Sequence, residues 1–333
     1  MPQRHTPSRR KALTLACAAV CALAAPFAPS ALAADAYPSK PIKLVVPYPP
    51  GGPTDIVARV VGQKLSEGLG QTVIIDNRPG AGANLGAEAV ARSEPDGYTL
   101  MLSTTAHAIN PSLFTKLKYS ITKDFAPISQ LTGGPLVIVA TPSLPANNVK
   151  ELIALAKSKN GGLNFASSGN GQSTHLSAEL FNTMAGVKMN HVPYKGSAPA
   201  LTDVMSGQTD VMFDTMLSST PFIKSGKLKA IAVTSAKRSP SAPNIPSVAE
   251  SGLPGYEALA WNGLMAPAGT PKAIIDKLNA EVKKVLAMPE VKQRFEAQGS
   301  FPAWTTPEDS AKFLQSEVEK WAKVVKESGA TVD

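Results

Sequence analysis

The chain has 333 residues, of which 43% are hydrophobic and 17% are charged, and its formal net charge is +8 at pH 7. Residues 1–33 hold four of the 33 basic residues and none of the 25 acidic ones, so the rest of the chain has 333 − 33 = 300 residues and a charge of 29 − 25 = +4. These charges are interspersed, whereas a nucleic-acid surface needs a clustered basic stripe, so we expect no nucleic acid as a partner.

Residues 1–33 have the features of an export signal. A basic head, an alanine- and leucine-rich segment and an A-x-A sequence at residues 31–33 follow one another. The alternative is a membrane anchor, but two prolines interrupt the apolar segment. The sequence SRRKAL at residues 8–13 also resembles a twin-arginine motif. We therefore expect a periplasmic protein that is cleaved near Ala33 and exported by the Sec or the twin-arginine route.

Short apolar runs alternate with amphipathic segments along the other 300 residues. The runs are rich in Val, Ile and Leu, as buried parallel strands are, and we expect strands at residues 42–46, 72–75, 98–103, 136–140, 163–166, 211–213 and 228–234. Apolar stripes predict helices within residues 56–65, 152–156 and 274–286, and first-turn prolines predict long helices at 271–287 and 307–327. This alternation predicts an α/β architecture with parallel sheets, in two domains.

The first glycine corner is VPYPPGGPTD at residues 46–55, where a strand meets the start of a helix. Free N–H groups at a helix start, with the helix dipole behind them, form a site for an anion. A phosphate-binding P-loop is not indicated, because no lysine follows Gly51 and Gly52. The alternative is a purely structural turn in which Thr54 or Asp55 caps the helix.

Two later corners repeat this arrangement, at residues 167–176 (SSGNGQSTHL) and 191–197 (HVPYKGS). The first contains no acidic residue, which leaves the positive end of its helix uncompensated and suits a carboxylate. The alternative for it is an Asn/Gly loop with a hydroxyl cap. The second corner adds the charge of Lys195 and the ring of Tyr194. Asp214 ends a strand, where it either faces a crevice or caps the next turn.

Other chemistries have little support. Both cysteines, Cys17 and Cys21, lie in the signal, so the rest of the chain has no thiol and no disulfide. Its three histidines lack H-x-x-x-H spacing, so we expect no metal site. The sequence RPGAGANLG at residues 78–86 approaches a dinucleotide fingerprint, but its spacing is one residue too long, and we expect no cofactor. No motif organises a nucleophile, so these corners indicate a protein that binds rather than an enzyme.

Seven segments, in order along the chain beyond residue 33, together resemble the Bug family, the extracytoplasmic solute receptors of tripartite tricarboxylate transporters. They are VPYPPGGPTD (46–55), NRPGAG (77–82), PDGYTL (95–100), DF (124–125), HVPYKG (191–196), GKLKAIAV (226–233) and APAGTP (266–271). The resemblance implies a periplasmic-binding-protein fold of two α/β lobes with a ligand cleft between them. The first lobe would hold residues 34–135 and 260–333, and the second residues 136–259.

The resemblance also implies a ligand and partners. Family members bind small carboxylates, namely di- and tricarboxylates, acidic amino acids and aromatic acids, and deliver them to membrane permease subunits; we expect a monomer. Ligand-binding residues carried over from the family are Tyr48, Gly51, Gly52, Thr54, Asp55, Ser103, Thr104, Ser167, Ser168, Gly169, Thr174, Tyr194, Lys195, Gly196 and Asp214. An ionised Asp214 in the cleft would favour an amino acid, whereas a capping Asp214 would leave a plain di- or tricarboxylate.

Three alternatives stay open. The first is a receptor that presents its closed form to a membrane signalling kinase. The second is an exported serine hydrolase that uses Ser168 or Ser173 with His175, although no acid is expected to orient that histidine. The third is a structural exported protein that no ligand stabilises.

Overall fold

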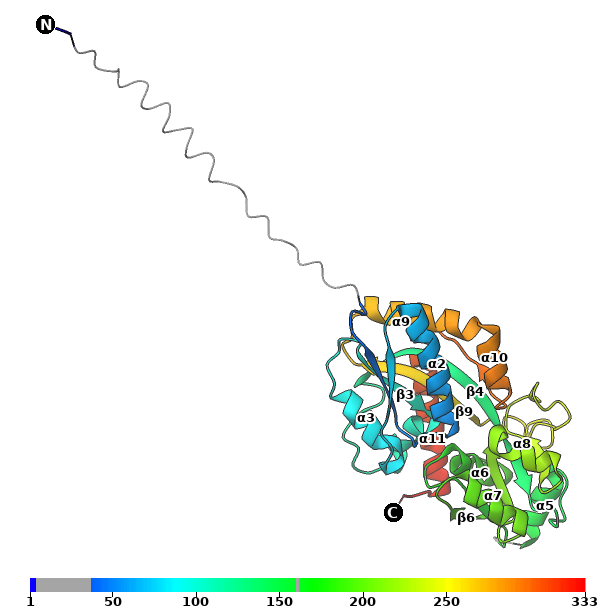
Figure 1. Ribbon diagram of the computed structural model, residues 1–333. Coiled ribbons are helices and arrows are strands. Elements are labelled where there is room, and N and C mark those ends of the chain that lie inside the picture. Colours follow the sequence, from blue (N-terminus) through cyan, green and yellow to red (C-terminus); the bar gives the residue numbers. More distant parts are fainter. Residues whose placement is uncertain (4–36, 160–161, 333) are drawn as a thin grey trace. The chain divides into compact units, whose positions relative to one another are not determined.

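The computed structural model describes residues 1–3, 37–159 and 162–332 (Figure 1). Nearly all of the predicted export signal, with both cysteines, therefore lies outside the described residues. All helices and strands of the described residues belong to the unit that begins at Pro38. Within the described ranges, none of the helices combines the length and the apolar character that crossing a bilayer requires.

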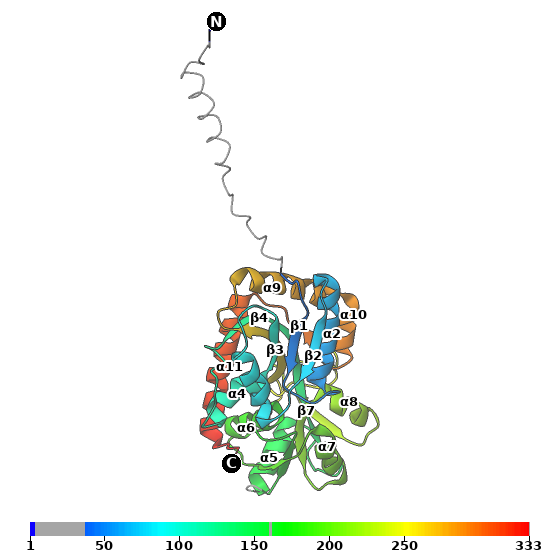
Figure 2. The same ribbon diagram turned by 60° about the vertical axis from the view of Figure 1, so that its left-hand side comes forward.

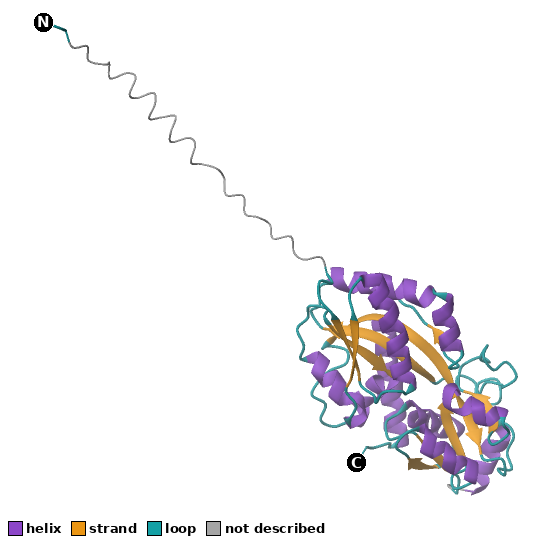
Figure 3. Ribbon diagram, in the orientation of Figure 1, coloured by secondary structure: helices purple, strands orange, loops and turns teal. Residues whose placement is uncertain are grey.

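Two mixed sheets share one long strand, β4. The strands are β1 (Ile42–Val46), β2 (Val73–Asn77), β3 (Thr99–Thr104), β4 (Phe125–Ala140), β5 (Asn164–Ser167), β6 (Asn190–Pro193), β7 (Val211–Thr215), β8 (Lys229–Val233), β9 (Leu259–Pro267) and β10 (Phe301–Pro302). The first sheet has the order β2-β1-β3-β9-β4-β10 and the second β6-β5-β7-β4-β8. In Figure 3 the strands of both sheets are drawn in orange. β4 thus connects the sheets covalently.

The prediction of parallel sheets is only partly right. β1 pairs in parallel with β2 and β3, and β5 pairs in parallel with β6 and β7. β4, however, is antiparallel to β7, β8 and β9. The reason is that a strand covered on both faces reads as a continuous apolar run in either direction, so composition alone does not reveal its direction.

Helices cover both sheets. They are α2 (Pro53–Leu69), α3 (Asn84–Ala91), α4 (Thr105–Leu113), α5 (Val149–Lys159), α6 (Ser173–Ala185), α7 (Ser197–Ser206), α8 (Met216–Lys224), α9 (Lys272–Ala287), α10 (Pro289–Glu296) and α11 (Pro307–Ser328), with a short 3-10 turn at Ala81–Ala83. The two long C-terminal helices that the sequence predicts are confirmed as α9 and α11. The Thr306 hydroxyl accepts a bond from Asp309 N at the start of α11, and Gly329 ends it in a left-handed conformation.

The C-terminal helix α11 packs on both halves of the molecule. It contacts α4, which follows a strand of the first sheet, and α6, which follows a strand of the second (Figure 2). Ile109 of α4, Phe181 of α6 and Trp321 of α11 belong to one buried apolar cluster. The chain passes from one sheet to the other along β4 and β9, near the pair formed by Pro135 of β4 and Leu259 of β9. The lobe ranges expected from the sequence stay a prediction.

Candidate functional site

A cavity of about 600 Å³ is surrounded by the starts of five helices. The residues that line it at those starts are Gly52, Pro53 and Thr54 of α2, Thr104, Thr105 and Ala106 of α4, Gln172, Ser173 and Thr174 of α6, Gly196, Ser197 and Ala198 of α7, and Thr215 and Ser218 of α8. The remaining lining residues are Tyr48, Pro49, Ser168, Lys195, Ala260, Trp261 and Asn262. Because these helices follow strands of both sheets, the cavity lies where the two sheets meet.

Three of the five helix starts have no side-chain cap. The N-cap residues Gly52 of α2, Gln172 of α6 and Gly196 of α7 make no capping hydrogen bond with their side chains. By contrast, α4 begins with a capping box in which His107 Nδ1 accepts a bond from Thr104 N at 3.0 Å, and the Thr215 hydroxyl accepts a bond from Ser218 N at the start of α8. The positive ends of α2, α6 and α7 therefore meet at one cavity, and none of their N-cap side chains bonds to the first N–H groups, which favours an anion there.

The charges around the cavity have the same bias. Among the lining residues, all of which lie in the described ranges, Lys195 is the sole charged side chain, and it is exposed. Asp55, in the first turn of α2, is buried and does not line the cavity; its carboxylate accepts bonds from Gly51 N at 2.9 Å, Arg59 Nε at 2.8 Å and Asn77 Nδ2 at 2.9 Å. Burial opposes these bonds, but together they lower the pKa of Asp55. The negative charge of Asp55 is therefore neutralised by partners within the corner and does not face the cavity.

Hydrogen bonds fix the two corners of the second sheet to each other. The Thr174 hydroxyl accepts a bond from Ser168 N at 3.0 Å and lies 2.8 Å from Ser168 Oγ. Tyr194 N donates to the carbonyl of Ser167, and Gly196 N donates to that of Ser168, at 3.0 and 3.1 Å. The starts of α6 and α7 are thus held side by side. The Tyr194 hydroxyl donates to Asp203 Oδ2 at 2.6 Å.

A hydrogen bond spans the cavity between the two sheets. The Tyr48 hydroxyl, which follows β1, donates to Gln172 Oε1, which precedes α6, at 3.4 Å. It also lies 3.1 Å from Thr104 Oγ1. Burial raises the pKa of Tyr48, while the bond from Thr104 opposes that shift. The phenol is therefore a neutral donor at neutral pH.

Asp214 lies behind the cavity wall rather than on it. Its carboxyl group is fully buried and accepts bonds from Ser197 Oγ at 2.6 Å and Ser219 Oγ at 2.8 Å. Burial raises its pKa, and the bonds from these hydroxyls counteract part of the shift. Asp214 therefore fastens the starts of α7 and α8 in place, which is closer to the capping alternative than to a group that faces the ligand.

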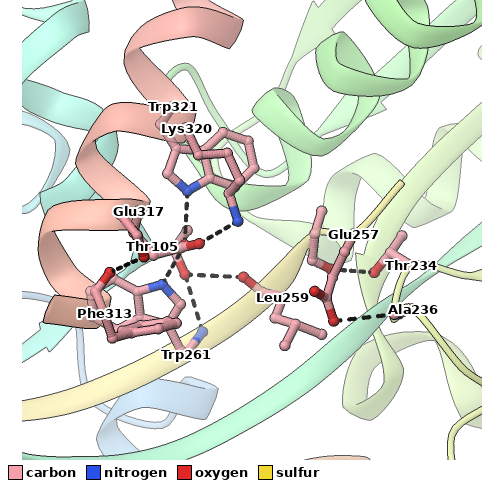
Figure 4. A network of polar contacts seen from close by, with 12 residues as sticks. Thr105, Thr234, Ala236, Glu257, Leu259, Trp261, Phe313, Glu317, Lys320 and Trp321 are labelled. Carbon is pink, nitrogen blue, oxygen red and sulfur yellow. Dashed lines mark hydrogen bonds and ion pairs between the residues drawn. The ribbon is translucent and has the colours of Figure 1, made fainter. Parts of the chain in front are cut away.

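Trp261 forms part of the wall and is held by α11 (Figure 4). Its indole N–H donates to Glu317 Oε2 at 2.8 Å, and the indole of Trp321 donates to the same oxygen at 3.0 Å. Its backbone N–H donates to Thr105 Oγ1 at 3.1 Å. The buried carboxylate of Glu317 also pairs with Lys320. A C-terminal helix far away in the sequence therefore shapes the wall.

Eight of the fifteen residues carried over from the family line the cavity: Tyr48, Gly52, Thr54, Thr104, Ser168, Thr174, Lys195 and Gly196. Seven do not: Gly51, Asp55, Ser103, Ser167, Gly169, Tyr194 and Asp214. Those seven lie within three residues of the lining, or support it as Asp55 and Asp214 do. The ligand-binding roles of all fifteen stay predictions.

Several lining residues were not expected. Gln172, Ser173 and Ser197 lie inside corners that the sequence singles out and Ala198 directly follows one, so their spacing from the glycines was an available signal. Thr105, Thr215, Ser218, Ala260, Trp261 and Asn262 carry no comparable pattern. They enter the site through β9 and through the pairing of the sheets, which depend on contacts distant in sequence.

The arrangement that a serine hydrolase requires differs from the observed contacts. The Ser168 hydroxyl bonds to Thr174, and His175 Nδ1 accepts a bond from Gly171 N. Glu179 Oε1 lies 3.7 Å from His175 Nε2, which is near but beyond hydrogen-bond distance for an acid that would orient the ring. His191 Nε2 lies 2.6 Å from Ser167 Oγ, but Ser167 is fully buried. These contacts hold the corner at residues 167–176 in its conformation.

Comparisons in sequence agree with the geometry. The profile of the family described as "Tripartite tricarboxylate transporter family receptor" matches residues 57–330. "Protein BugT" of Bordetella pertussis is 40% identical over 301 residues, which cover 90% of this chain and 92% of that protein. A "UPF0065 protein in tcbD-tcbE intergenic region" of Pseudomonas sp. strain P51 is 38% identical over 294 residues, 88% of each chain.

Similar solved structures share the fold over nearly their full length. "R. palustris Rpa4515 with adipate" matches with a TM-score of 0.80 and 37% identity, over 89% of this chain and 99% of that one. "MatC (Rpa3494) from Rhodopseudomonas palustris with bound malate" matches with a TM-score of 0.76 and 36% identity, over 87% and 100%. "Structure of periplasmic binding protein BugD" matches with 0.77 and 37%, over 89% and 99%. The expected two-lobed periplasmic-binding-protein fold is thereby confirmed.

Proposed function

Because the chain belongs to the Bug family of tripartite tricarboxylate transporter receptors, we propose that it is a periplasmic receptor that captures a small carboxylate and delivers it to the permease subunits of such a transporter. The ligand occupies the cavity between the two sheets. The proposed lobes are residues 34–135 with 260–333, and residues 136–259. The receptor acts as a monomer and is not an enzyme.

The observation that carries this proposal is the meeting of three helix starts without an N-cap side-chain bond at one cavity, where Lys195 is the sole charged side chain among the described lining residues. Backbone N–H groups, the positive ends of helix dipoles and a lysine all favour a negative charge. Adipate and malate, with which two of the similar structures were solved, are both dicarboxylates. A volume of about 600 Å³ accommodates molecules of this size.

Binding by neutral donors suits a receptor that must also release its ligand. Hydroxyls at the helix starts, such as those of Thr54, Ser173 and Thr174, donate charge-assisted hydrogen bonds to a carboxylate. When the cavity empties, such groups leave no buried charge without a partner. Closure of the lobes excludes water and strengthens each bond. A Kd of ~1 μM requires roughly −8 kcal/mol, which several such bonds supply. The permease then recognises the closed form.

A thermal-denaturation screen tests the proposed function. The full chain is expressed with its own signal, and the protein is purified from the periplasm and screened against a carboxylate library that includes adipate and malate. A ligand at about 100 times its Kd adds about 2.7 kcal/mol of stability, which appears as a rise in Tm. N-terminal sequencing of the same sample locates the cleavage site. The proposal fails if no carboxylate raises Tm while the protein unfolds cooperatively.

A further inference from the structure

Two histidine rings are stacked behind the corner at residues 167–174. The ring centroids of His175, on α6, and His191, on β6, are 3.7 Å apart and their planes differ by 9°. Phe165 of β5 stacks on His191 with its centroid at 4.8 Å. His175 is only 3% exposed. Two positive charges at such a short distance repel each other strongly, so the two rings are not both in the positively charged imidazolium form in the folded protein.

The polar atoms of both rings hold the backbone of the same corner. His175 Nδ1 accepts a hydrogen bond from Gly171 N at 3.2 Å. His191 Nε2 lies 2.6 Å from Ser167 Oγ, and Ser167 Oγ accepts a bond from Gly169 N at 3.2 Å. The corner between β5 and α6 is therefore fixed at both of its glycines through imidazole nitrogens.

These contacts assign the protons. An amide N–H only donates, so His175 Nδ1 carries no proton, and the proton of this ring lies on Nε2, 3.7 Å from Glu179 Oε1. The Ser167 hydroxyl accepts from Gly169 N and has two acceptors within reach of its own proton, Gly169 O at 3.3 Å and His191 Nε2 at 2.6 Å, of which the shorter distance favours His191 Nε2. His191 then carries its proton on Nδ1. Both rings are neutral in this arrangement.

The surroundings of the pair are mixed in charge. Besides Glu179 on α6, Lys188 before β6 and Glu327 on α11 line a cavity of about 700 Å³ that His191 also lines. Burial and, to a lesser extent, the adjacent His175 lower the pKa of His191 to about 3. The neutral form of His191 is therefore the one present at neutral pH.

We propose that His175 and His191 are positioning residues for ligand binding, which act as neutral imidazoles and hold residues 167–171 in the shape that turns Ser168 and Thr174 toward the ligand. This rests on the proposed function, because Ser168 and Thr174 line the proposed ligand cavity. Protonation of His175 at Nδ1 would place two donors, the imidazolium N–H and the Gly171 N–H, face to face. This would break their hydrogen bond and release the corner.

Nitrogen NMR of the ligand-free protein, purified from the periplasm, tests the assignment without any ligand. The expected result is a proton on Nε2 of His175 and on Nδ1 of His191, with the Gly169 and Gly171 amide signals titrating at the same midpoint as the imidazole signals. The opposite tautomers, or glycine amides that do not respond to the titration of the rings, would overturn the proposal.

Paired variants test the effect on binding by calorimetry with adipate and malate at neutral pH. His175→Phe keeps the ring but removes the acceptor, and affinity falls about tenfold, whereas His175→Asn keeps an acceptor near Nδ1 and loses less than about threefold. His191→Phe and His191→Gln form the second pair, and Glu327→Gln, in the second cavity, is the control with unchanged affinity.

Equal losses in the Phe and the acceptor-retaining variants would contradict the positioning role. If neither acid binds the unmodified protein, the proposed function fails for these ligands. The tautomers, which are read without ligand, still decide the assignment of the two histidines. The circular dichroism spectrum and Tm of each variant show whether it is folded.

Discussion

The Tyr48 hydroxyl donates to Gln172 Oε1 at 3.4 Å and thereby joins the corner after the first strand of one sheet to the corner before α6 of the other. Thr104 Oγ1, 3.1 Å from the same hydroxyl, is placed to donate to it. The three side chains form a hydrogen-bonded row along the cavity. A ligand that displaced these hydrogen bonds, or that bonded to the same groups, would contact residues of both sheets at once.

Removal of the Tyr48 hydroxyl is expected to weaken binding. The Tyr48→Phe variant loses the bond across the cavity, so affinity for a bound dicarboxylate falls about five- to tenfold, the effect of one hydrogen bond. Isothermal calorimetry measures it. Tyr98→Phe is the matched control, because the Tyr98 hydroxyl accepts a bond from Ser39 N and Tyr98 does not line the cavity. A larger loss in the control than in Tyr48→Phe would refute the role of the bridge.

The charge of Lys195 is expected to favour dianions over monoanions. Replacement by Met removes the sole charged side chain of the lining, so the affinity for adipate falls more than that for a monocarboxylate of equal length, and its dependence on salt becomes shallower. Binding titrations at low and high ionic strength measure both effects. Lys188→Met, outside this cavity, leaves them unchanged. An identical salt dependence in Lys195→Met would show that Lys195 does not contribute.

Substitution of Asp214 is expected to affect all carboxylates alike. Asp214→Ala leaves the Ser197 and Ser219 hydroxyls without their acceptor in a buried site, which costs about 2–3 kcal/mol of folding free energy. Because Ser197 begins α7 and lines the cavity, affinity falls as well. Urea unfolding and calorimetry with an amino acid and a plain dicarboxylate measure the two losses. A loss confined to the amino acid would instead place Asp214 against its ammonium group.

The carboxylate of Glu317 is expected to matter for stability and for the cavity wall. Glu317→Ala leaves the indole N–H groups of Trp261 and Trp321 unpaired, at a cost of about 2–4 kcal/mol. Glu319→Ala, at an exposed position of the same helix, costs less than about 0.5 kcal/mol. Chemical denaturation followed by tryptophan fluorescence gives both values. Equal effects of the two substitutions would argue against the buried network.

Acid is expected to destabilise the protein through its buried histidines. Burial lowers the pKa of His107 to about 4, from an ordinary value of 6.5. The unfolded chain therefore binds a proton on this histidine that the folded protein does not, so its contribution is present above pH 6.5 and is lost as the pH falls. Between pH 6.5 and about 4.5 the loss is about 2 kcal/mol.

The variant His107→Asn isolates this term. It keeps an acceptor for the Thr104 N–H, which bonds to His107 Nδ1 at 3.0 Å, but does not titrate. Urea unfolding of both proteins at several pH values should give curves that diverge in this window. His191 contributes with the same sign, whereas Asp214, whose pKa is raised, contributes with the opposite one, and both are common to the two proteins. Parallel curves would mean that His107 is not neutral and buried.

Local signals in the sequence suffice for much of the fold. The apolar run at residues 42–46 corresponds to β1, and prolines in the first turn locate α9 and α11 to within a residue or two. The first half of β4 escapes prediction, because its sequence FAPISQLTGG mixes proline, glycine and polar residues. Its strand conformation comes from pairing with β9, more than a hundred residues later. Pairing at such separations has no local signature.

The same distinction holds for the site. Glycine corners between strands and helices identify Gly52, Thr54, Ser168 and Thr174, because the physics of a helix start is local. The support of the site is not local. Trp261 depends on Glu317, 56 residues away, and the stacking of His175 on His191 depends on the register between β5 and β6. Such support arises only when the sheets assemble.

The position of α11 restricts how the two halves of the protein can separate. This one helix packs on both α4 and α6, so it holds the two halves together on one side of the molecule. Separation of the halves on that side would remove buried apolar side chains such as Trp321 from the residues they pack against. We therefore expect the two halves to separate on the side away from α11, where a ligand would enter and leave the cavity.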